Sequence, residues 1–239
     1  MAETIYTIPI NEVFEENMAD GSDSCPFCTL AEKLEADELE LILGASMMEP
    51  DIRIKTNKQG FCSAHFTKML RISKRLPLAL MLESHLGELS GAVNKKGLMK
   101  PSPDKIAKIL GELSNDCYVC SRIEYNMKRL ISNAVYMWQT DDEFRKKLSA
   151  QPYICIGHAA AMLRTAASEM KKRDYSDFSD AITTLVGDHL RSLCDDVSTF
   201  ARSFDYRYAD EKLDAETKIS VERSVRFLAG DKTVDISKI

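Results

Sequence analysis

Apolar side chains recur every three or four residues along most of the chain, at the spacing that places them on one face of an α-helix. One stripe consists of Ile123, Met127, Leu130, Ile131, Ala134, Val135 and Trp138. A second consists of Ile182, Leu185, Val186, His189, Leu193, Val197, Phe200 and Phe204. Both stripes predict long helices that each bury a single face.

Residues beside such stripes mark where helices begin and end. Ser102 is predicted to cap a helix that has Pro103 in its first turn. The inward face of that helix is predicted to consist of Ile106, Ile109, Leu110 and Leu113. Gly60 and Gly230 are predicted to end helices. Only residues 4–10, TIYTIPI, have a strand-like composition, and one short extended arm makes no sheet. The predicted fold class is therefore all-α.

The composition is that of a soluble globular protein, with 44% hydrophobic and 29% charged residues among 239. The formal net charge of −5 argues against general nucleic-acid binding, which requires a basic surface. The longest apolar run, residues 76–82, is much shorter than the roughly 20 residues of a membrane helix. The first residues lack the basic and apolar regions of a secretory signal. We expect a cytoplasmic protein with no membrane contact.

Six of the seven cysteines and two of the four histidines form four short pairs. In chain order the pairs are CxxC, CxxH, CxxC and CxxH, made of Cys25 and Cys28, Cys62 and His65, Cys117 and Cys120, and Cys155 and His158. The gap from CxxC to CxxH is 33 residues in the first half and 34 in the second. HFTKMLR and HAAAMLR follow the two CxxH cysteines, and HLGEL and HLRSL occur later. These matches predict an internal duplication of about 92 residues.

The pairs have the residue types and spacings of zinc ligands. A CxxC turn presents both thiolates on one side, and a CxxH pair at the start of a helix shares one helix face. Because a reducing compartment disfavours disulfides, we predict two closed, structural Zn²⁺ sites, each with three cysteines and one histidine. Pairing within each half is the simpler arrangement. The crossed alternative joins Cys25 and Cys28 to Cys155 and His158.

Other chemistries use similar motifs. An iron–sulfur cluster is the main alternative to zinc, although its usual ligands are all cysteines. The CPFC sequence also occurs in thioredoxin-like proteins, but that chemistry requires a βαβ unit, and no alternating βα pattern surrounds this motif. Unligated thiols are the remaining interpretation.

The organisation that follows is one compact helical bundle, residues 1–239, built from two tandem pseudo-repeats that are each stapled by a CxxC/CxxH metal site. Repeat 1 covers residues 22–100 and repeat 2 covers residues 101–204. Residues 205–239 have no counterpart in the first half and are predicted to form a closing helix. Since each repeat alone has a limited core, a metal staple in each would support folding.

A few further residues invite a functional interpretation. His85 and His189 occupy equivalent repeat positions on apolar faces, which favours satisfied core histidines over a convergent ligand or acid/base pair. Cys194 is predicted to be a buried packing thiol. The acidic stretch from Glu32, EKLEADELE, is interpreted as an exposed helical surface. Basic residues follow both CxxH motifs and are interpreted as solvated faces or a surface for an anionic partner: Lys68, Arg71, Lys74, Arg75, Arg164, Lys171, Lys172 and Arg173.

The chain resembles a bacterial domain-of-unknown-function family whose members have about this length. The matching segments are IYTIPINEVFE, CPFC, EPDIRIKTNKQGFCSAHF, FDYRYADE and FLAG, which together span most of the sequence. The resemblance implies an intact fold with cysteine and histidine ligands and supplies no reaction.

These observations favour a non-enzymatic zinc protein that acts as a cytoplasmic interaction or regulatory module with a protein partner. A redox or metal-sensing protein with iron–sulfur clusters or reactive thiols is the alternative. An enzyme that uses His85 and His189 is a third and weaker hypothesis, because no nucleophile motif and no open coordination position is evident. Neither a substrate nor an oligomeric state follows from the sequence.

Overall fold

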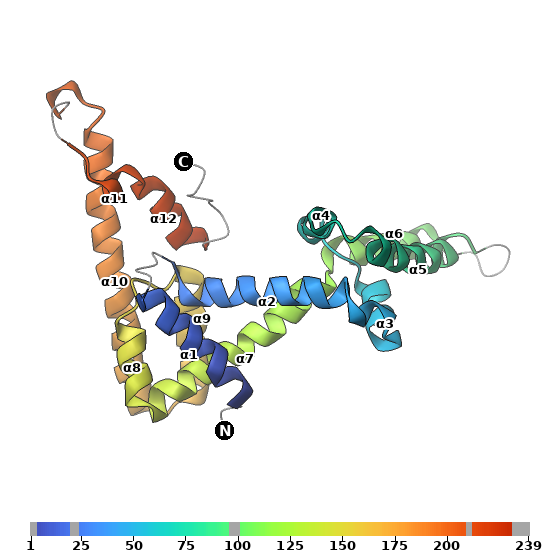
Figure 1. The fold of residues 1–239 in the computed structure, drawn as a ribbon, viewed down its shortest axis with the longest axis horizontal. Coiled ribbons are helices and arrows are strands. Elements are labelled where there is room, and N and C mark those ends of the chain that lie inside the picture. Colours follow the sequence, from blue (N-terminus) through green and yellow to red (C-terminus); the bar gives the residue numbers. More distant parts are fainter. Residues whose placement is uncertain (1–3, 20–23, 96–100, 209–211, 231–239) are drawn as a thin grey trace. The chain divides into compact units, whose positions relative to one another are not determined.

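The computed structural model describes residues 4–19, 24–95, 101–208 and 212–230. Within these ranges every regular element is a helix, so the all-α prediction is confirmed (Figure 1). The α-helices are α1 (Thr4–Ala19), α2 (Pro26–Ile42), α3 (Pro50–Gln59), α4 (Ser63–Ile72), α5 (Arg75–Val93), α6 (Pro103–Asn115), α7 (Tyr118–Thr140), α8 (Asp142–Ser149), α9 (Ile156–Glu169), α10 (Lys172–Arg202), α11 (Ala215–Lys218) and α12 (Ser220–Ala229). Two short 3₁₀ helices, η1 (Ala45–Met48) and η3 (Tyr206–Tyr208), complete the set.

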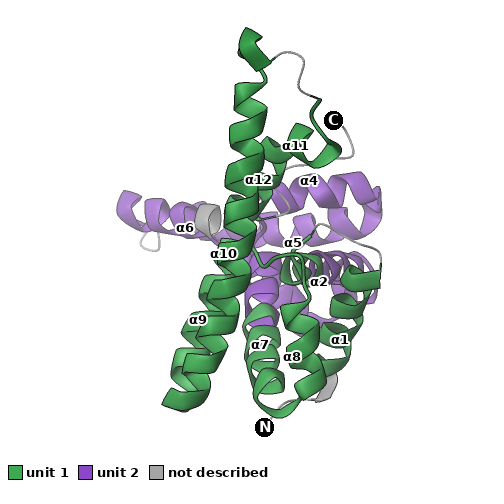
Figure 2. Ribbon diagram, turned by 90° about the vertical axis from the view of Figure 1, so that its left-hand side faces the viewer, with its two compact units in different colours: residues 1–31, 127–239 green, residues 32–126 purple. Residues whose placement is uncertain are grey.

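The chain divides into two compact units (Figure 2). Unit 1 comprises residues 1–31 and 127–239, and unit 2 comprises residues 32–126. The borders lie inside α2 and α7, whereas the predicted repeats meet at residues 100 and 101. Each unit therefore takes helices from both predicted repeats. The duplication, and the packing of residues 1–239 into one body, stay predictions.

The N-terminal helix corrects one expectation, because the predicted extended arm is the beginning of α1. Ile10, Val13 and Phe14 are at most 1% exposed, and their i, i+3, i+4 spacing is helical. Phe14 packs against Phe27 and Phe144, with ring centroids 5.5 and 5.2 Å away. Burial of this face outweighs both the β-branched composition of the first turns and the presence of Pro9 inside the helix. The Asn17 side chain of α1 donates to the Ser24 carbonyl at 2.9 Å and so contacts the backbone directly before Cys25.

The remaining helices of unit 1 bury the first predicted stripe from Met127 onward and only part of the second. Every predicted member of the α7 stripe from Met127 to Trp138 is buried. On α10 the buried positions are Phe178, Ile182, His189 and Leu193, while Phe204 lies beyond the helix end and is 78% exposed. α12 packs against α9 and α10. The predicted closing segment 205–239 therefore contributes η3, α11 and α12, and its residues 209–211 and 231–239 lie outside the described part.

Unit 2 has its own core, formed by α2, α4, α5 and α7 together with Leu43, Phe61 and Cys117 of the connecting segments. Its buried members are Leu39, Ile42, Leu43, Phe61, Met69, Leu78, Met81, Cys117, Tyr118 and Val119. The predicted cap of α6 is confirmed, because the Ser102 hydroxyl accepts from the Lys105 N–H at 3.3 Å. The predicted inward face of α6 is only partly correct, since Leu110 is 47% exposed, while Ile106 and Ile109 are half-buried. The side chain of Leu113 lies outside the described set.

Gly60 ends α3, as predicted, and also connects two motifs. Its φ of 65° is in the left-handed region, where a glycine has no side-chain penalty. Its carbonyl accepts from the Tyr118 N–H at 3.0 Å. This bond joins the segment before Cys62 to the segment after Cys117. Gly230 ends α12 in the same way, with φ of 92°.

Candidate metal centres

All four ligand pairs lie at the N-terminus of a helix. The first residue of each pair directly precedes the helix and the second lies in its first turn, on α2, α4, α7 and α9. In each case the carbonyl of the first cysteine accepts a hydrogen bond from the first turn, at 2.9 to 3.1 Å. Residues i and i+3 then share one side of the helix start, as the CxxC and CxxH spacings require.

The structure brings the pairs together in the crossed arrangement. Cys25 and Cys28 meet Cys155 and His158 in unit 1, which we call the unit 1 cluster. The other four residues meet in unit 2 and form the unit 2 cluster: Cys62, His65, Cys117 and Cys120. The simpler expectation, that each repeat closes its own site, is wrong. Each cluster instead takes one pair from each predicted repeat.

Helix length explains the crossing. α2 has 17 residues and α7 has 23, so these helices carry the chain about 25 and 35 Å away from their CxxC motifs. The next helices, α3 and α8, have only 10 and 8 residues and do not retrace that length. The CxxH motif of the same repeat therefore begins near the far end of the long helix. The order of the motifs in the sequence does not reveal this distance, and the CxxC and CxxH pairs therefore cannot be matched from their order alone.

The unit 1 cluster is centred on the imidazole of His158. Its Nδ1 lies 3.2 Å from Cys155 Sγ, 3.5 Å from Cys28 Sγ and 3.6 Å from Cys25 Sγ. The sulfurs of Cys28 and Cys155 are 3.8 Å apart. The thiols are 0 to 5% exposed, while the imidazole is half-buried and lies against the Phe27 ring at 5.7 Å.

The unit 2 cluster repeats this geometry around His65. Its Nδ1 lies 3.1 Å from Cys62 Sγ, 3.2 Å from Cys117 Sγ and 3.5 Å from Cys120 Sγ. The sulfurs of Cys62 and Cys120 are 3.9 Å apart. Here the imidazole is the buried member, at 4% exposure, whereas Cys62 is partly exposed and Cys120 is exposed.

Both clusters have the dimensions of a tetrahedral zinc site. Zn–S bonds of about 2.3 Å in a tetrahedron place two sulfurs about 3.8 Å apart. One sulfur pair in each cluster matches this separation, at 3.8 Å for Cys28 and Cys155 and 3.9 Å for Cys62 and Cys120. In each cluster all four donor atoms lie within 4.8 Å of one another. Each cluster could therefore hold one metal ion through three sulfurs and one nitrogen.

The metal-free thiols of unit 1 differ in proton affinity. Burial raises the pKa of Cys25 well above its usual value, and the neighbouring Cys155 and Cys28 thiols raise it further. Hydrogen bonds from Cys25 and Cys28 lower the pKa of Cys155 far below its usual value. Cys155 therefore has the lower pKa of the two and releases its proton more readily than Cys25.

Unit 2 shows the same division. Burial, with the adjacent Cys117 and Cys62 thiols, raises the pKa of Cys120 to about 12. Burial also acts to raise the pKa of Cys62, but hydrogen bonds from the His65 backbone N–H and from neighbouring thiols lower it overall. A cation that binds either cluster as a tris-thiolate must displace protons.

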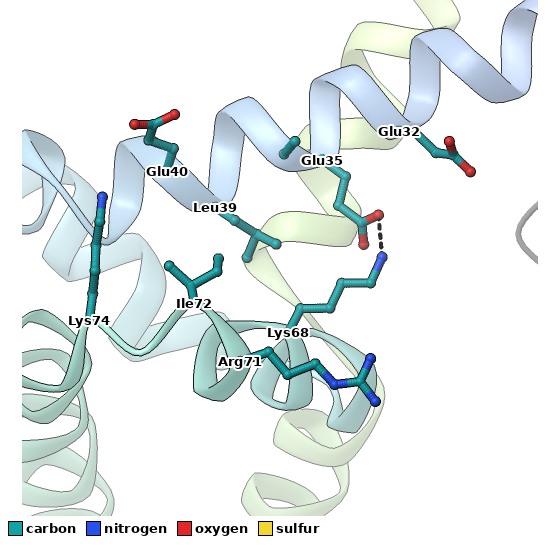
Figure 3. A pocket seen from close by; sticks show the side chains of 9 residues that line it. Glu32, Glu35, Leu39, Glu40, Lys68, Arg71, Ile72 and Lys74 are labelled. Atoms are coloured by element: carbon teal, nitrogen blue, oxygen red, sulfur yellow. Dashed lines mark hydrogen bonds and ion pairs between the residues drawn. The ribbon is translucent and has the colours of Figure 1, made fainter.

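Glu35 is a functional residue that the sequence interpretation missed. Its stretch was expected to be an exposed surface, but Glu35 and Glu38 are each only 7% exposed. His65 Nε2 lies 2.8 Å from Glu35 Oε1. Lys68 Nζ lies 2.6 Å from Glu35 Oε2 (Figure 3). A carboxylate at Nε2 fixes the tautomer that leaves Nδ1 free to bind a metal. The sequence signal is the i, i+4 spacing of Glu35 with Leu39 and of Glu38 with Ile42, which places both acids beside the buried face of α2.

A groove in unit 2 adjoins this carboxylate. It has a volume of about 580 Å³ and lies between α2 and α4 (Figure 3). Leu39 and Ile72 line its apolar part, and Arg71 and Lys74 line its α4 side. Three of the basic residues that follow the first CxxH motif therefore gather at one groove: Lys68, Arg71 and Lys74.

The remaining candidate residues have other surroundings. His85 belongs to unit 2, where its Nδ1 donates to the Asn57 carbonyl at 2.8 Å. His189 belongs to unit 1 and is buried in a stack on Tyr153, at 4.4 Å between ring centroids. His85 fits the interpretation as a satisfied histidine, and His189 fits it as a buried core residue. The prediction for Cys194 is wrong, because this thiol is exposed: it follows the buried Leu193 and is turned about 100° away from it around the helix.

Comparisons with known proteins agree with the resemblance seen in the sequence. No curated protein matches the chain, and no solved structure matches it either. None of the described helices combines the length and hydrophobicity needed to cross a membrane. One family model, described as a family of unknown function (DUF6062), matches residues 1–235. The chain, with its two crossed Cys₃His clusters, belongs to this DUF6062 family.

Proposed function

We propose that the protein binds two Zn²⁺ ions, one in each cluster, and that each ion has a structural role. The observation that carries the proposal is the tetrahedral spacing of three sulfurs and one Nδ1, which occurs twice in the described residues. Three thiolates and one neutral imidazole are a typical closed zinc set that leaves no coordination position for a substrate. Each ion would join the starts of two helices that are far apart in sequence.

The compactness of the clusters supports zinc over an iron–sulfur cluster. In a [4Fe–4S] cluster each cysteine binds a different iron, which spreads the ligand sulfurs farther apart than binding to a single shared ion does. The sulfur pairs here lie 3.8 and 3.9 Å apart, a separation that suits a single shared ion. The carboxylate behind His65 is also a typical partner of a zinc-bound histidine.

Metal analysis of the purified chain tests the proposal. Mass spectrometry of the intact protein under native conditions, with elemental analysis of the same sample, should give two zinc ions per chain. Purification without oxygen should yield a colourless protein. Iron with absorption near 400 nm, or fewer than two ions after zinc is supplied, would contradict the proposed sites.

We propose further that unit 2 binds an acidic segment of a protein partner at its groove. The groove has walls of opposite charge, because the exposed Arg71 and Lys74 line its α4 side and the exposed Glu32 and Glu40 line its α2 side. Support for the proposal comes from the groove's apolar part and from the two cations on the α4 side, with which the acids of the segment would pair. Cations beside an apolar groove offer a counter-charge and a contact area to a segment with acidic and apolar side chains. This role would make the protein an interaction module whose zinc ions maintain the binding surface.

The partner role is tested by charge reversal. The double variant Arg71→Glu/Lys74→Glu should lose a protein that co-purifies with the tagged chain in its native host. The matched control is Arg164→Glu/Lys172→Glu, which reverses two exposed cations that follow the second CxxH motif. Loss of the partner from both variants, or from neither, would contradict binding at the groove.

A further inference from the structure

The two clusters differ in which of their side chains are shielded from solvent. In unit 1 the three thiols are 5% exposed or less, and the imidazole of His158 is the more accessible ligand. In unit 2 the imidazole of His65 is buried, and Cys120 is exposed. Sulfur reacts with oxidants and electrophiles, whereas imidazole is far less reactive toward them, so accessible sulfur determines susceptibility.

We propose that the unit 2 cluster is an oxidative modification site at which peroxide-class oxidants join Cys120 to Cys62 and expel the metal. This inference rests on the proposed binding of zinc to both clusters. The unit 1 cluster keeps its ion under the same conditions. The protein then has one permanent and one oxidant-labile zinc centre.

The geometry favours these two sulfurs. Cys62 and Cys120 are the two ligands of the unit 2 cluster that solvent reaches, and their sulfurs are 3.9 Å apart. Cys117, the third sulfur, is 5% exposed. Cys62 directly precedes α4 and Cys120 lies in the first turn of α7, so a small shift of two helix ends brings the sulfurs to bonding distance. An incoming peroxide meets Cys120 first.

The reaction balances with peroxide as the only added reactant. The Cys120 thiolate attacks one peroxide oxygen, the O–O bond breaks, and a sulfenic acid and one hydroxide form. The Cys62 thiolate then attacks that sulfur, an S–S bond forms, and a second hydroxide leaves. The two sulfurs lose two electrons and the peroxide gains them. Zn²⁺ keeps its charge but loses two of its four ligands, and it departs from the remaining Cys117 and His65.

Release of this ion would also change the groove between α2 and α4. His65 contacts both the cluster and Glu35, and Glu35 contacts Lys68 at the groove. An imidazole freed from the metal is no longer held toward Glu35 from the other side, so the Glu35 and Lys68 pair at the groove is free to rearrange. Oxidation would therefore act on the surface proposed for the partner, and reduction by a thiol would restore it.

The experiment uses the full zinc-loaded chain with the Cys194→Ala substitution, because Cys194 is the exposed thiol outside both clusters. Hydrogen peroxide is added in excess, and a chromogenic zinc chelator follows ion release. We expect one of the two ions to leave at least about ten-fold faster than the other. Peptide mapping after alkylation should then show a Cys62–Cys120 disulfide, with the unit 1 cysteines unoxidised.

The outcomes distinguish failure of the proposed zinc binding from failure of the proposed oxidation. A chain that never carries two zinc ions contradicts the proposed function and not the difference in access. A chain that carries two ions but releases neither, or both at one rate, overturns the inference. A disulfide within Cys117 and Cys120, or oxidation of Cys25 before Cys120, also overturns it. N-ethylmaleimide provides a second measurement, since Cys120 should be labelled before any unit 1 cysteine.

Discussion

The unit 1 and unit 2 clusters have the same ligands, the same helix-start geometry and nearly the same distances, but different surroundings. In unit 1 the apolar core covers the sulfurs. In unit 2 a buried carboxylate supports the histidine, while two sulfurs remain accessible. Ligand identity therefore defines what each site can bind, and the surroundings define how tightly and how reversibly it binds. The predictions below test that distinction.

Removal of one ligand from the buried cluster should have the largest effect. Cys25→Ser leaves two thiols and a histidine in a dry site, so the unit 1 ion should be lost. Apparent zinc binding in such sites is worth about 10–16 kcal/mol and is coupled to folding, which is comparable to the whole stability of a domain. We expect the variant to bind one zinc ion, and unit 1 to lose its cooperative thermal transition.

The paired variant Cys120→Ser sharpens the comparison. It should also bind one zinc ion, but its unfolding should be confined to unit 2, because each cluster lies wholly within its own unit. Cys194→Ser is the control and should bind two ions and melt like the wild type. Loss of both ions from either single variant would show that the clusters are not independent.

Acid should remove both ions together, in contrast to oxidant. Without metal, the pKa of Cys120 is raised to about 12 and that of Cys25 is also raised, whereas a bound thiolate carries no proton. Binding therefore releases protons, the affinity rises with pH, and it is lost as pH falls. Each cluster has one thiol with a lowered pKa and one with a raised pKa. The zinc affinity of the two clusters should therefore fall with similar slopes, by roughly ten-fold or more per pH unit.

Competition titrations with a zinc chelator between pH 6 and 8 would measure both slopes. Similar slopes, together with different rates of oxidation, would show that access to the sulfurs distinguishes the centres. A much steeper slope for one cluster would show instead that proton affinity distinguishes them.

Glu35→Gln should weaken only the unit 2 ion. The amide keeps the size of the side chain but loses the charge that orients His65 and offsets Lys68. Loss of such a partner typically reduces metal affinity by roughly 10- to 100-fold. Glu40→Gln is the matched control, because Glu40 is an exposed acid of α2 that lines the same groove. An equal effect of the two substitutions would assign the change to the groove's general charge.

The sequence predicts the ligands better than their partners. Cysteine and histidine spacing reports local geometry, so the eight residues that form the two clusters, and the helix class, follow from it. Pairing depends on how far α2 and α7 carry the chain, and exposure depends on which helices cover each cluster. Glu35 and Glu38 were misassigned because a run of acids resembles a solvated face, although each lies one helical turn from apolar core positions. The arm at residues 4–10 was misassigned because burial of Ile10 and Phe14 overrides β-propensity.

The smallest expected effects concern the helix caps. Removing a cap tests how much stability the helices have that does not depend on metal binding. Asp141 in unit 1 accepts from the N–H groups of Glu143 and Phe144 at 2.9 and 3.2 Å, and Phe144 is fully buried. Ser102 in unit 2 accepts only from Lys105, at 3.3 Å on an exposed helix start. Cap removal costs about 0.5–2 kcal/mol, so Asp141→Ala should fall near the upper end and Ser102→Ala near the lower end in chemical denaturation of the zinc-loaded chain. Both variants should still carry two ions, because a helix cap and a metal ligand stabilise different parts of the same unit. Loss of zinc from either cap variant would contradict this separation. It would show that α6 or α8, which carry none of the clustered residues, is needed to hold a cluster together.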